Sequence, residues 1–273
     1  MNSTLILLLT FIFFSLPALS ETKSSQYTLS LQKGFSLKEF ERPPYGFESS
    51  HLLPPLITLN IKKDVPTSYW QVQLDFMSVG LPFINFDYGG KFKLSPNLEF
   101  TAGLGITLNN VIKTEPYKDS QFSYVAYSLF ANGEYQLGPF LIGTNFRFKE
   151  ITETTLASFE SKTTKIDHDS DYILSPYILV DVYILKLKGE YTLYQLGRTA
   201  IASDDFGYGY NSLSVGIAKL SVGIPLPKMT LWITYQKLDN ISDETAFMYQ
   251  APHFSRDYLL AKEAAFANLT WRF

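Results

Sequence analysis

The sequence of 273 residues contains no cysteine and only three histidines. Without cysteine there is no disulfide, no thiolate metal ligand and no thiol nucleophile. Lys and Arg together number 23 against 26 Asp and Glu, so the net charge is −3. A chain without a basic excess has no electrostatic footprint for nucleic acid. These absences exclude thiol chemistry and make a nucleic-acid partner unexpected.

Long apolar runs are missing from almost the whole chain. Beyond the first twenty residues no segment reaches the roughly 18 consecutive apolar residues that a membrane-spanning helix needs. The one apolar stretch, from Leu5 to Leu16, is followed by Pro17 and by Ala18-Leu19-Ser20. A short apolar core followed by small residues is typical of a cleavable secretory signal, although this one has no Lys or Arg before its core. We therefore predict a signal at residues 1–20 and one mature domain at 21–273, with an uncleaved anchor as the alternative.

Aromatic residues are abundant, with 18 Tyr and 22 Phe, and they fall into a period of two. From Trp70 to Phe76, for example, apolar residues at even positions alternate with polar residues at odd positions. Alternation of this kind predicts strands with one apolar and one polar face. It predicts about twelve strands, at residues 27–31, 57–62, 70–76, 84–94, 98–108, 125–137, 140–148, 174–182, 185–193, 213–224, 229–238 and 258–273. Pro176 within one of them suggests a bulge or a late strand start.

The connections between these strands alternate in length. Short ones are expected at residues 63–68, 95–97, 138–139, 183–184 and 225–228. Long ones are expected at 36–55, 109–121, 150–170, 197–211 and 239–257, and residues 78–82 form the one short connection on the long side. Short turns at one end and long loops at the other are typical of membrane barrels. We therefore predict an all-β fold, a transmembrane antiparallel β-barrel with up-and-down meander topology.

Aromatic residues also fall near many of the expected strand ends. In membrane barrels, girdles of aromatic side chains lie at both membrane interfaces. The sequence predicts such girdles from Tyr69, Trp70, Phe122, Tyr124, Tyr135, Phe140, Phe148, Tyr172 and Tyr194.

The last strand has a distinctive end. Ala265, Ala267, Leu269, Trp271 and Phe273 alternate with polar residues up to the final position. This pattern resembles the C-terminal β-signal of Gram-negative outer-membrane proteins. The resemblance implies a place in the outer membrane, contact with its lipids and lipopolysaccharide, and recognition by the barrel assembly machinery. It does not point to a narrower family or to an activity.

The polar faces of the strands supply candidate residues for a lumen. Those expected to line it are Lys62, Asp75, Asp87, Lys91, Lys93, Glu99, Glu134, Arg147, Lys149, Asp181, Lys186, Lys188, Glu190 and Arg272. Eight of them are cationic and six anionic. A mixture of this kind can line a narrow water-filled pore or form ion pairs that fill the barrel. The sequence favours a narrow passive pore for small solutes with weak ionic selectivity. A plugged, structural or surface-binding barrel that acts through its loops, as an adhesin or receptor does, is the alternative.

Catalytic and metal-binding patterns are weak. His51, His168 and His253 all fall in expected loops, outside the strand-face setting that a barrel hydrolase needs. Asp167, Asp169 and Asp171 open like a calcium loop, but the turn Gly and the bidentate Glu of that motif are missing. We therefore predict no enzyme, no cofactor and no metal site, with a barrel-embedded hydrolase as a third and less favoured possibility.

Overall fold

The computed structural model describes residues 26–38, 57–76, 83–109, 121–157, 163–197, 199–202, 207–210, 213–239 and 262–273. The predicted signal at 1–20 lies outside the described residues, as do His51, His253 and most of the long loops. The described part consists of strands and turns. Among the described residues, no helix is long and apolar enough to cross a membrane.

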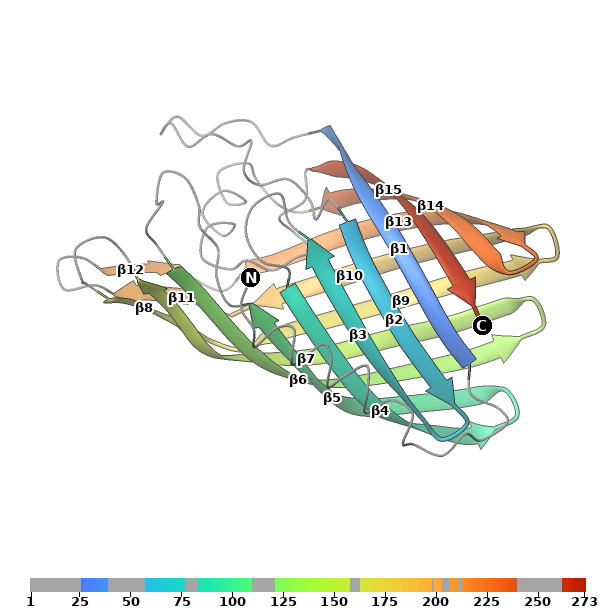
Figure 1. Cartoon of the computed structure of the whole chain (residues 1–273), viewed down its shortest axis with the longest axis horizontal. Helices are drawn as coiled ribbons and strands as arrows, with labels where there is room; N and C mark the ends of the chain where they lie inside the picture. Colours follow the sequence, from blue (N-terminus) through green and yellow to red (C-terminus); the bar gives the residue numbers. More distant parts are fainter. Residues whose placement is uncertain are drawn as a thin grey trace.

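The strands follow one another along the chain in an antiparallel arrangement (Figure 1). Their bounds are β1 Gln26–Lys38, β2 Ile57–Val65, β3 Ser68–Phe76, β4 Phe83–Ser95, β5 Leu98–Asn109, β6 Gln121–Leu137, β7 Phe140–Ala157, β8 Thr163–His168, β9 Asp171–Val182, β10 Leu185–Leu196, β11 Thr199–Ala202, β12 Gly207–Tyr210, β13 Leu213–Leu226, β14 Met229–Asp239 and β15 Glu263–Arg272.

Twelve of these strands form a closed barrel. Each barrel strand pairs with the next barrel strand along the chain, including β7 with β9 and β10 with β13, and β1 pairs with β15 to close the ring. Closure leaves no strand of the ring with an unpaired edge, which a sheet surrounded by lipid requires. The predicted meander barrel of about twelve strands is confirmed.

The barrel is apolar outside and polar inside. Large apolar side chains face outward and remain exposed, such as Leu94 at 68% and Leu104 at 63%. Polar side chains on the opposite face are buried, among them Asp75, Thr192 and Gln236. This reversal of the usual arrangement of a water-soluble protein suits a wall with lipid on one side.

Tight turns join the strands at one end, which we call the turn end. They lie at residues 66–67, 96–97, 138–139, 183–184 and 227–228. Gly138 has a φ of +56°, a conformation that glycine adopts without steric cost. All five predicted short connections are therefore confirmed. The opposite end, to which the long loops attach, we call the loop end.

The structure extends the sheet beyond the predicted strand ends at the loop end. We expected residues 150–170 to be a loop, but β7 continues to Ala157 and pairs there with β8. β8 then pairs with β11, and β11 with β12, which lie in the expected loop 197–211. His168 is thus the last residue of a strand, not a loop residue. Three of the six residues from Ile151 to Leu156 are threonine, a residue that favours strands.

Two predictions about single positions are corrected. Pro176 neither bulges nor delays β9, because it pairs opposite Thr144 of β7 without a register shift. Pro176 instead interrupts the pairing of β9 with its other neighbour, β10, in which residues 175 and 176 have no partner. Proline has no backbone N–H to donate to that strand. Tyr69 and Tyr194 were expected in the outer girdles, but both side chains are buried on the inner face.

The barrel closes where the two ends of the described chain meet. Phe273 and Tyr27 exchange backbone hydrogen bonds of 2.9 and 3.2 Å. Ala265, Ala267, Leu269 and Trp271 occupy alternate positions on β15, in the phase of the outward-facing residues of β1 and β14. The arrangement suits the assembly signal that the sequence suggests, whose recognition stays a prediction.

Candidate functional site

The inner wall of the barrel carries most of the charged side chains of the described strands. Starting from Lys62, the paired positions run through Gln71, Asp87 and Gly105 to Ser128. Directly paired residues of an antiparallel sheet share a face. Followed in the same way around the ring, the register assigns all fourteen candidate lumen residues to this one face.

One polar group on this face surrounds Asp75, which is completely buried. Its carboxylate accepts hydrogen bonds from Thr58 Oγ1 at 2.8 Å, Gln73 Nε2 at 3.0 Å and Asn85 Nδ2 at 3.1 Å. Thr107 in turn donates to Asn85 Oδ1 at 2.8 Å. The group joins β2, β3, β4 and β5 and satisfies a charge that would be costly to bury alone.

A second group joins β4 to β7. Arg147 forms a bidentate pair with Asp87, with N–O distances of 2.8 and 3.0 Å, and also donates to Ser128 Oγ at 3.0 Å. The guanidinium reaches Asp87 by passing over Gly105, where an added Cβ would lie 2.2 Å from Asp87 Oδ1 and 3.2 Å from Arg147 Nη1. Glycine is thus required at this position for the pair to lie against the wall. The Phe130 ring supports the cation at 5.2 Å from the centroid.

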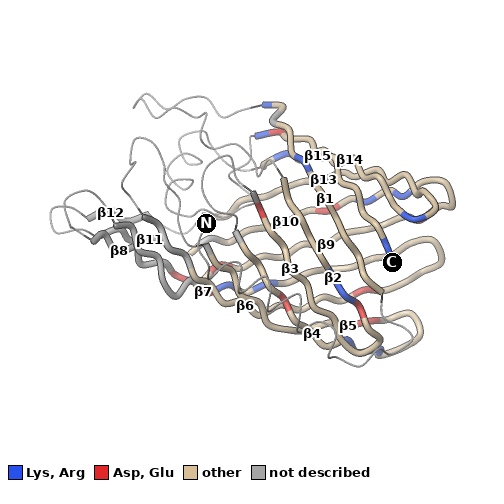
Figure 2. The backbone as a smooth tube through the Cα atoms, viewed as in Figure 1, with Lys and Arg blue, Asp and Glu red and all other residues tan. Residues whose placement is uncertain are grey.

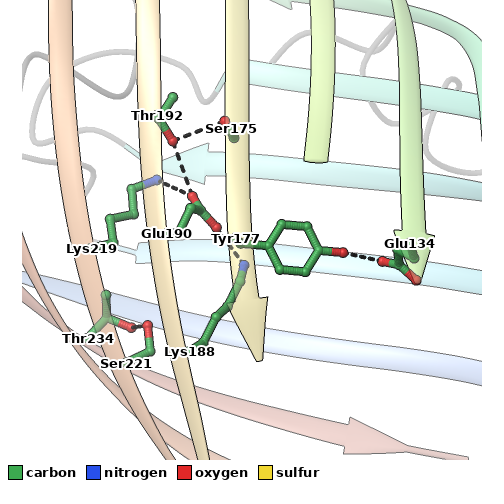
Figure 3. Close-up of polar contacts among 9 residues, drawn as sticks. All are labelled: Glu134, Ser175, Tyr177, Lys188, Glu190, Thr192, Lys219, Ser221 and Thr234. Atoms are coloured by element: carbon green, nitrogen blue, oxygen red, sulfur yellow. Dashed lines mark hydrogen bonds and ion pairs between the residues drawn. The ribbon is translucent and has the colours of Figure 1, made fainter. Parts of the chain in front are cut away.

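A third group lies on the other side of the lumen (Figure 3). Glu190 accepts hydrogen bonds from Lys188 Nζ at 2.5 Å and Lys219 Nζ at 3.2 Å. Lys188 also sits over the Tyr177 ring, 4.6 Å from its centroid. Tyr177 crosses β7 and donates a hydrogen bond to Glu134 on β6. The crossing depends on Gly143, where an added Cβ would lie 2.4 Å from Tyr177 Cζ.

Near the turn end Asp64 is held between two lysines. Lys62 Nζ lies 3.0 Å and Lys91 Nζ 2.6 Å from its carboxylate oxygens. This arrangement of lysine, carboxylate and lysine repeats that of Lys188, Glu190 and Lys219. Lys62 and Asp64 lie on β2 and Lys91 on β4, whereas Lys188 and Glu190 lie on β10 and Lys219 on β13. In the ring order these two sets of strands lie on opposite sides of the twelve-stranded barrel.

The remaining predicted residues are placed mainly by register. Lys93 lies opposite Glu99, Lys149 opposite Asp171 and Arg272 opposite Thr28. Lys186 pairs with Asp181 at the turn between β9 and β10.

Sequence reasoning missed four of the residues that take part. Asp64, Asp171, Tyr177 and Lys219 were absent from the candidate set, although each has the phase of its inward neighbours. Carrying the alternation through every position of each strand would have found Tyr177 and Lys219. Asp64 was placed in a turn that begins two residues later, and Asp171 fell between the expected loop 150–170 and the expected strand 174–182.

Access to the inner face differs between the two ends. Near the turn end, the side chains of Lys62, Lys188 and Asp181 are 34, 31 and 46% exposed. Near the loop end, Val215 and Ile217 of β13 are completely buried. The lumen is therefore open to water toward the turn end and closely packed toward the loop end.

The chemistry of this wall is that of paired charges. No group of three or more His, Cys, Asp and Glu side chains in the part of the chain that the structure describes could hold a metal ion. The lysines and carboxylates hold each other in fixed positions and present alternating charge to water. Such a surface can bind and pass small hydrated solutes, and it offers no activated nucleophile in the groups described above.

No protein-family model matches the chain, and no curated protein is similar to it in sequence. Solved structures do resemble it in fold. An outer-membrane channel from Pseudomonas putida F1 has a TM-score of 0.58 at 10% identity, over 92% of this chain and 95% of that one. The NanC porin has a TM-score of 0.51 at 9% identity, over 90% of this chain and 98% of that one. The toluene transporter TodX of P. putida has a TM-score of 0.50 at 9% identity, over 92% of this chain and 89% of that one.

The closed ring, the apolar exterior and these likenesses define the class. The chain has the fold of the outer-membrane β-barrel proteins. At this level of sequence identity, the likeness extends to the fold alone.

Proposed function

We propose that the protein is a narrow passive channel for small solutes in the outer membrane of a Gram-negative-type bacterium. The observation that carries the proposal is the pair of facing groups, Lys62–Asp64–Lys91 and Lys188–Glu190–Lys219, which expose charged side chains to the lumen. Charges fixed on opposite walls of a water-accessible bore are how channels hold and release hydrated solutes. The proposal is further supported by three structural neighbours whose names describe a porin, a channel and a transporter.

The charge balance of the inner wall supports weak ionic selectivity. Adding Lys219 to the eight predicted cations gives nine, and adding Asp64 and Asp171 to the six predicted anions gives eight. The two facing groups each carry one more lysine than carboxylate, which favours anions slightly. We propose no catalytic role, no cofactor and no resident metal.

The proposal is tested by conductance of the refolded protein in planar bilayers. We expect discrete steps, with a reversal potential close to zero in a salt gradient and displaced slightly in the direction of anion preference. The double variant K188Q/K219Q should move the reversal potential toward cation preference. A control variant, Lys237→Gln, changes an exposed lysine in the outward phase of β14 and should conduct like the wild type.

A second candidate is a plugged barrel that binds partners at its surface. It is favoured by the complete burial of Asp75, Val215 and Ile217 on the inner face. A filled interior predicts electrical silence from correctly folded protein at every voltage. That result, together with normal migration of the folded form on a gel, would replace the channel proposal with this one.

A further inference from the structure

One side of the inner wall, formed by β14, β15 and β1, is uncharged. From Met229 to Gln236 on β14 and from Ala264 to Trp271 on β15 there is no charged residue, and Figure 2 shows both strands uncharged between their ends. Six half-buried inward residues form two paired rows across the three strands, and we call them the neutral wall: Trp232, Asn268 and Gln32 in one row, and Thr230, Thr270 and Ser30 in the other. A solute on this side of the lumen meets hydroxyl, amide and aromatic groups and no ion pair.

The neutral wall contains an inward tryptophan. Of the three tryptophans of the chain, Trp70 and Trp271 have the outward phase and Trp232 the inward phase. Trp232 pairs with Gly223 of β13, where an added Cβ would lie 2.8 Å from Cε3 and Cζ3 and 2.9 Å from Cδ2 of the indole. Nearly equal distances to three successive ring atoms mean that a face of the ring, not its edge, covers the glycine. The opposite face of the indole is therefore turned toward the lumen.

A chain of hydrogen bonds links the polar side chains beside this ring. Thr270 Oγ1 donates to Asn268 Oδ1 at 3.1 Å, so Ser30 Oγ is the donor in its bond of 3.2 Å with Thr270 Oγ1. Asn268 Nδ2 in turn donates to Gln32 Oε1 at 3.5 Å. The chain uses the hydroxyl hydrogen of Ser30 and the carbonyl oxygen of Gln32, and it leaves the Ser30 oxygen as an acceptor and the Gln32 amide nitrogen as a donor. The wall therefore offers both acceptors and donors to a solute.

We propose that the neutral wall binds a neutral saccharide as it passes through the lumen, an inference that rests on the proposed channel function. The C–H face of one sugar ring stacks on the indole of Trp232, and its hydroxyls bond with Asn268, Gln32 and Ser30. A hydroxyl group both donates and accepts, so it matches the mixed polar groups of this wall, whereas a carboxylate only accepts and an ammonium only donates. An apolar solute would remove water from these groups without replacing its hydrogen bonds.

The test measures binding of maltose to the barrel refolded in a zwitterionic detergent without sugar headgroups, by saturation-transfer nuclear magnetic resonance. We expect Trp232→Ala to weaken binding about tenfold through loss of the stacking contact, and Trp232→Phe, which keeps a ring, to retain most of the affinity. Asn268→Ala should weaken binding about fivefold, the effect of losing one hydrogen-bonding group. Trp70→Ala, which removes an outward tryptophan, is the matched control and should bind like the wild type.

Binding and conductance are measured separately, so the saccharide site and the channel can fail independently. Equal maltose affinity in the wild type and Trp232→Ala would overturn the saccharide site even if the protein conducts, as would an equal loss in Trp70→Ala. Tighter binding of glucuronate than of maltose, lost in K188Q/K219Q and kept in Trp232→Ala, would place the site at the lysines and also overturn it. Maltose binding that depends on Trp232 in protein that does not conduct would support the site and contradict the channel. Migration of unheated samples checks that every variant is folded.

Discussion

At the scale of single residues, the inner wall is organised by side chains that reach across neighbouring strands. Arg147 of β7 pairs with Asp87 of β4, and Tyr177 of β9 donates to Glu134 of β6. Each crosses a glycine, so the long side chain lies along the wall instead of projecting into the lumen. These contacts tie strands that are not hydrogen-bonded to one another and so add lateral connections to the ladder of the sheet.

The Arg147–Asp87 pair leads to a prediction about stability. Asp87→Asn leaves a largely buried guanidinium with a neutral partner, and we expect it to lower the free energy of unfolding by about 2 kcal/mol. Replacing both residues, in D87N/R147Q, should cost less than the sum of the two single changes because neither charge is then left alone. Urea titration of the barrel in lipid vesicles measures all three. Strict additivity would contradict the energetic link between the two residues.

The sequence predicted the inward face of these residues but not their partners. Period-two alternation places Asp87 and Arg147 on one face because a strand has only two faces. It says nothing about contacts between strands that are separated by two others, since these depend on register and on where a glycine leaves room. The alternation could have placed Tyr177 on the inward face, but its hydrogen bond to Glu134 could not be predicted, because it depends on Gly143 of another strand.

At the scale of elements, the turns were predicted well and the loop ends were not. A tight turn has local chemistry, as at Gly138-Pro139, and so can be read from the residues themselves. The continuation of β7 to Ala157 is stabilised by pairing with β6 and with β8. The residues of β7 alone do not show which other strands will pair with them, so this extension could not be predicted from their sequence. Pro176 likewise leaves the pairing of β9 with β7 intact but interrupts its pairing with β10. The sequence does not show which of the two neighbouring strands faces the side of the proline that lacks an N–H.

The last strand carries a prediction about assembly. Phe273→Ala removes a side chain that is 73% exposed but keeps the backbone bonds to Tyr27. We expect the variant to refold from urea into vesicles with nearly wild-type stability, while much less of it reaches the membrane in cells. Quantitative immunoblots of membrane fractions measure the second effect. Equal loss in both assays would mean that the residue serves stability and not recognition.

At the scale of the whole molecule, closure of the ring makes unfolding cooperative. Every strand of the ring is hydrogen-bonded on both sides, so no strand can separate without breaking two ladders. We expect an unheated sample in dodecyl sulfate to migrate differently from a boiled one, because the closed barrel resists the detergent until heated. Identical migration of both samples would contradict a stable closed barrel.

The glycines of the inner wall have a consequence for the width of the bore. At Gly105 an added methyl group would displace Asp87, and with it the paired Arg147, and at Gly143 it would displace Tyr177 from the wall toward the axis. The diameter open to a solute is therefore set partly by residues that carry no functional group at all. Exchanging glycine for alanine at such positions would narrow the passage in steps of one side chain while every charge in it stayed the same, so the size limit and the charge preference of the barrel can change independently.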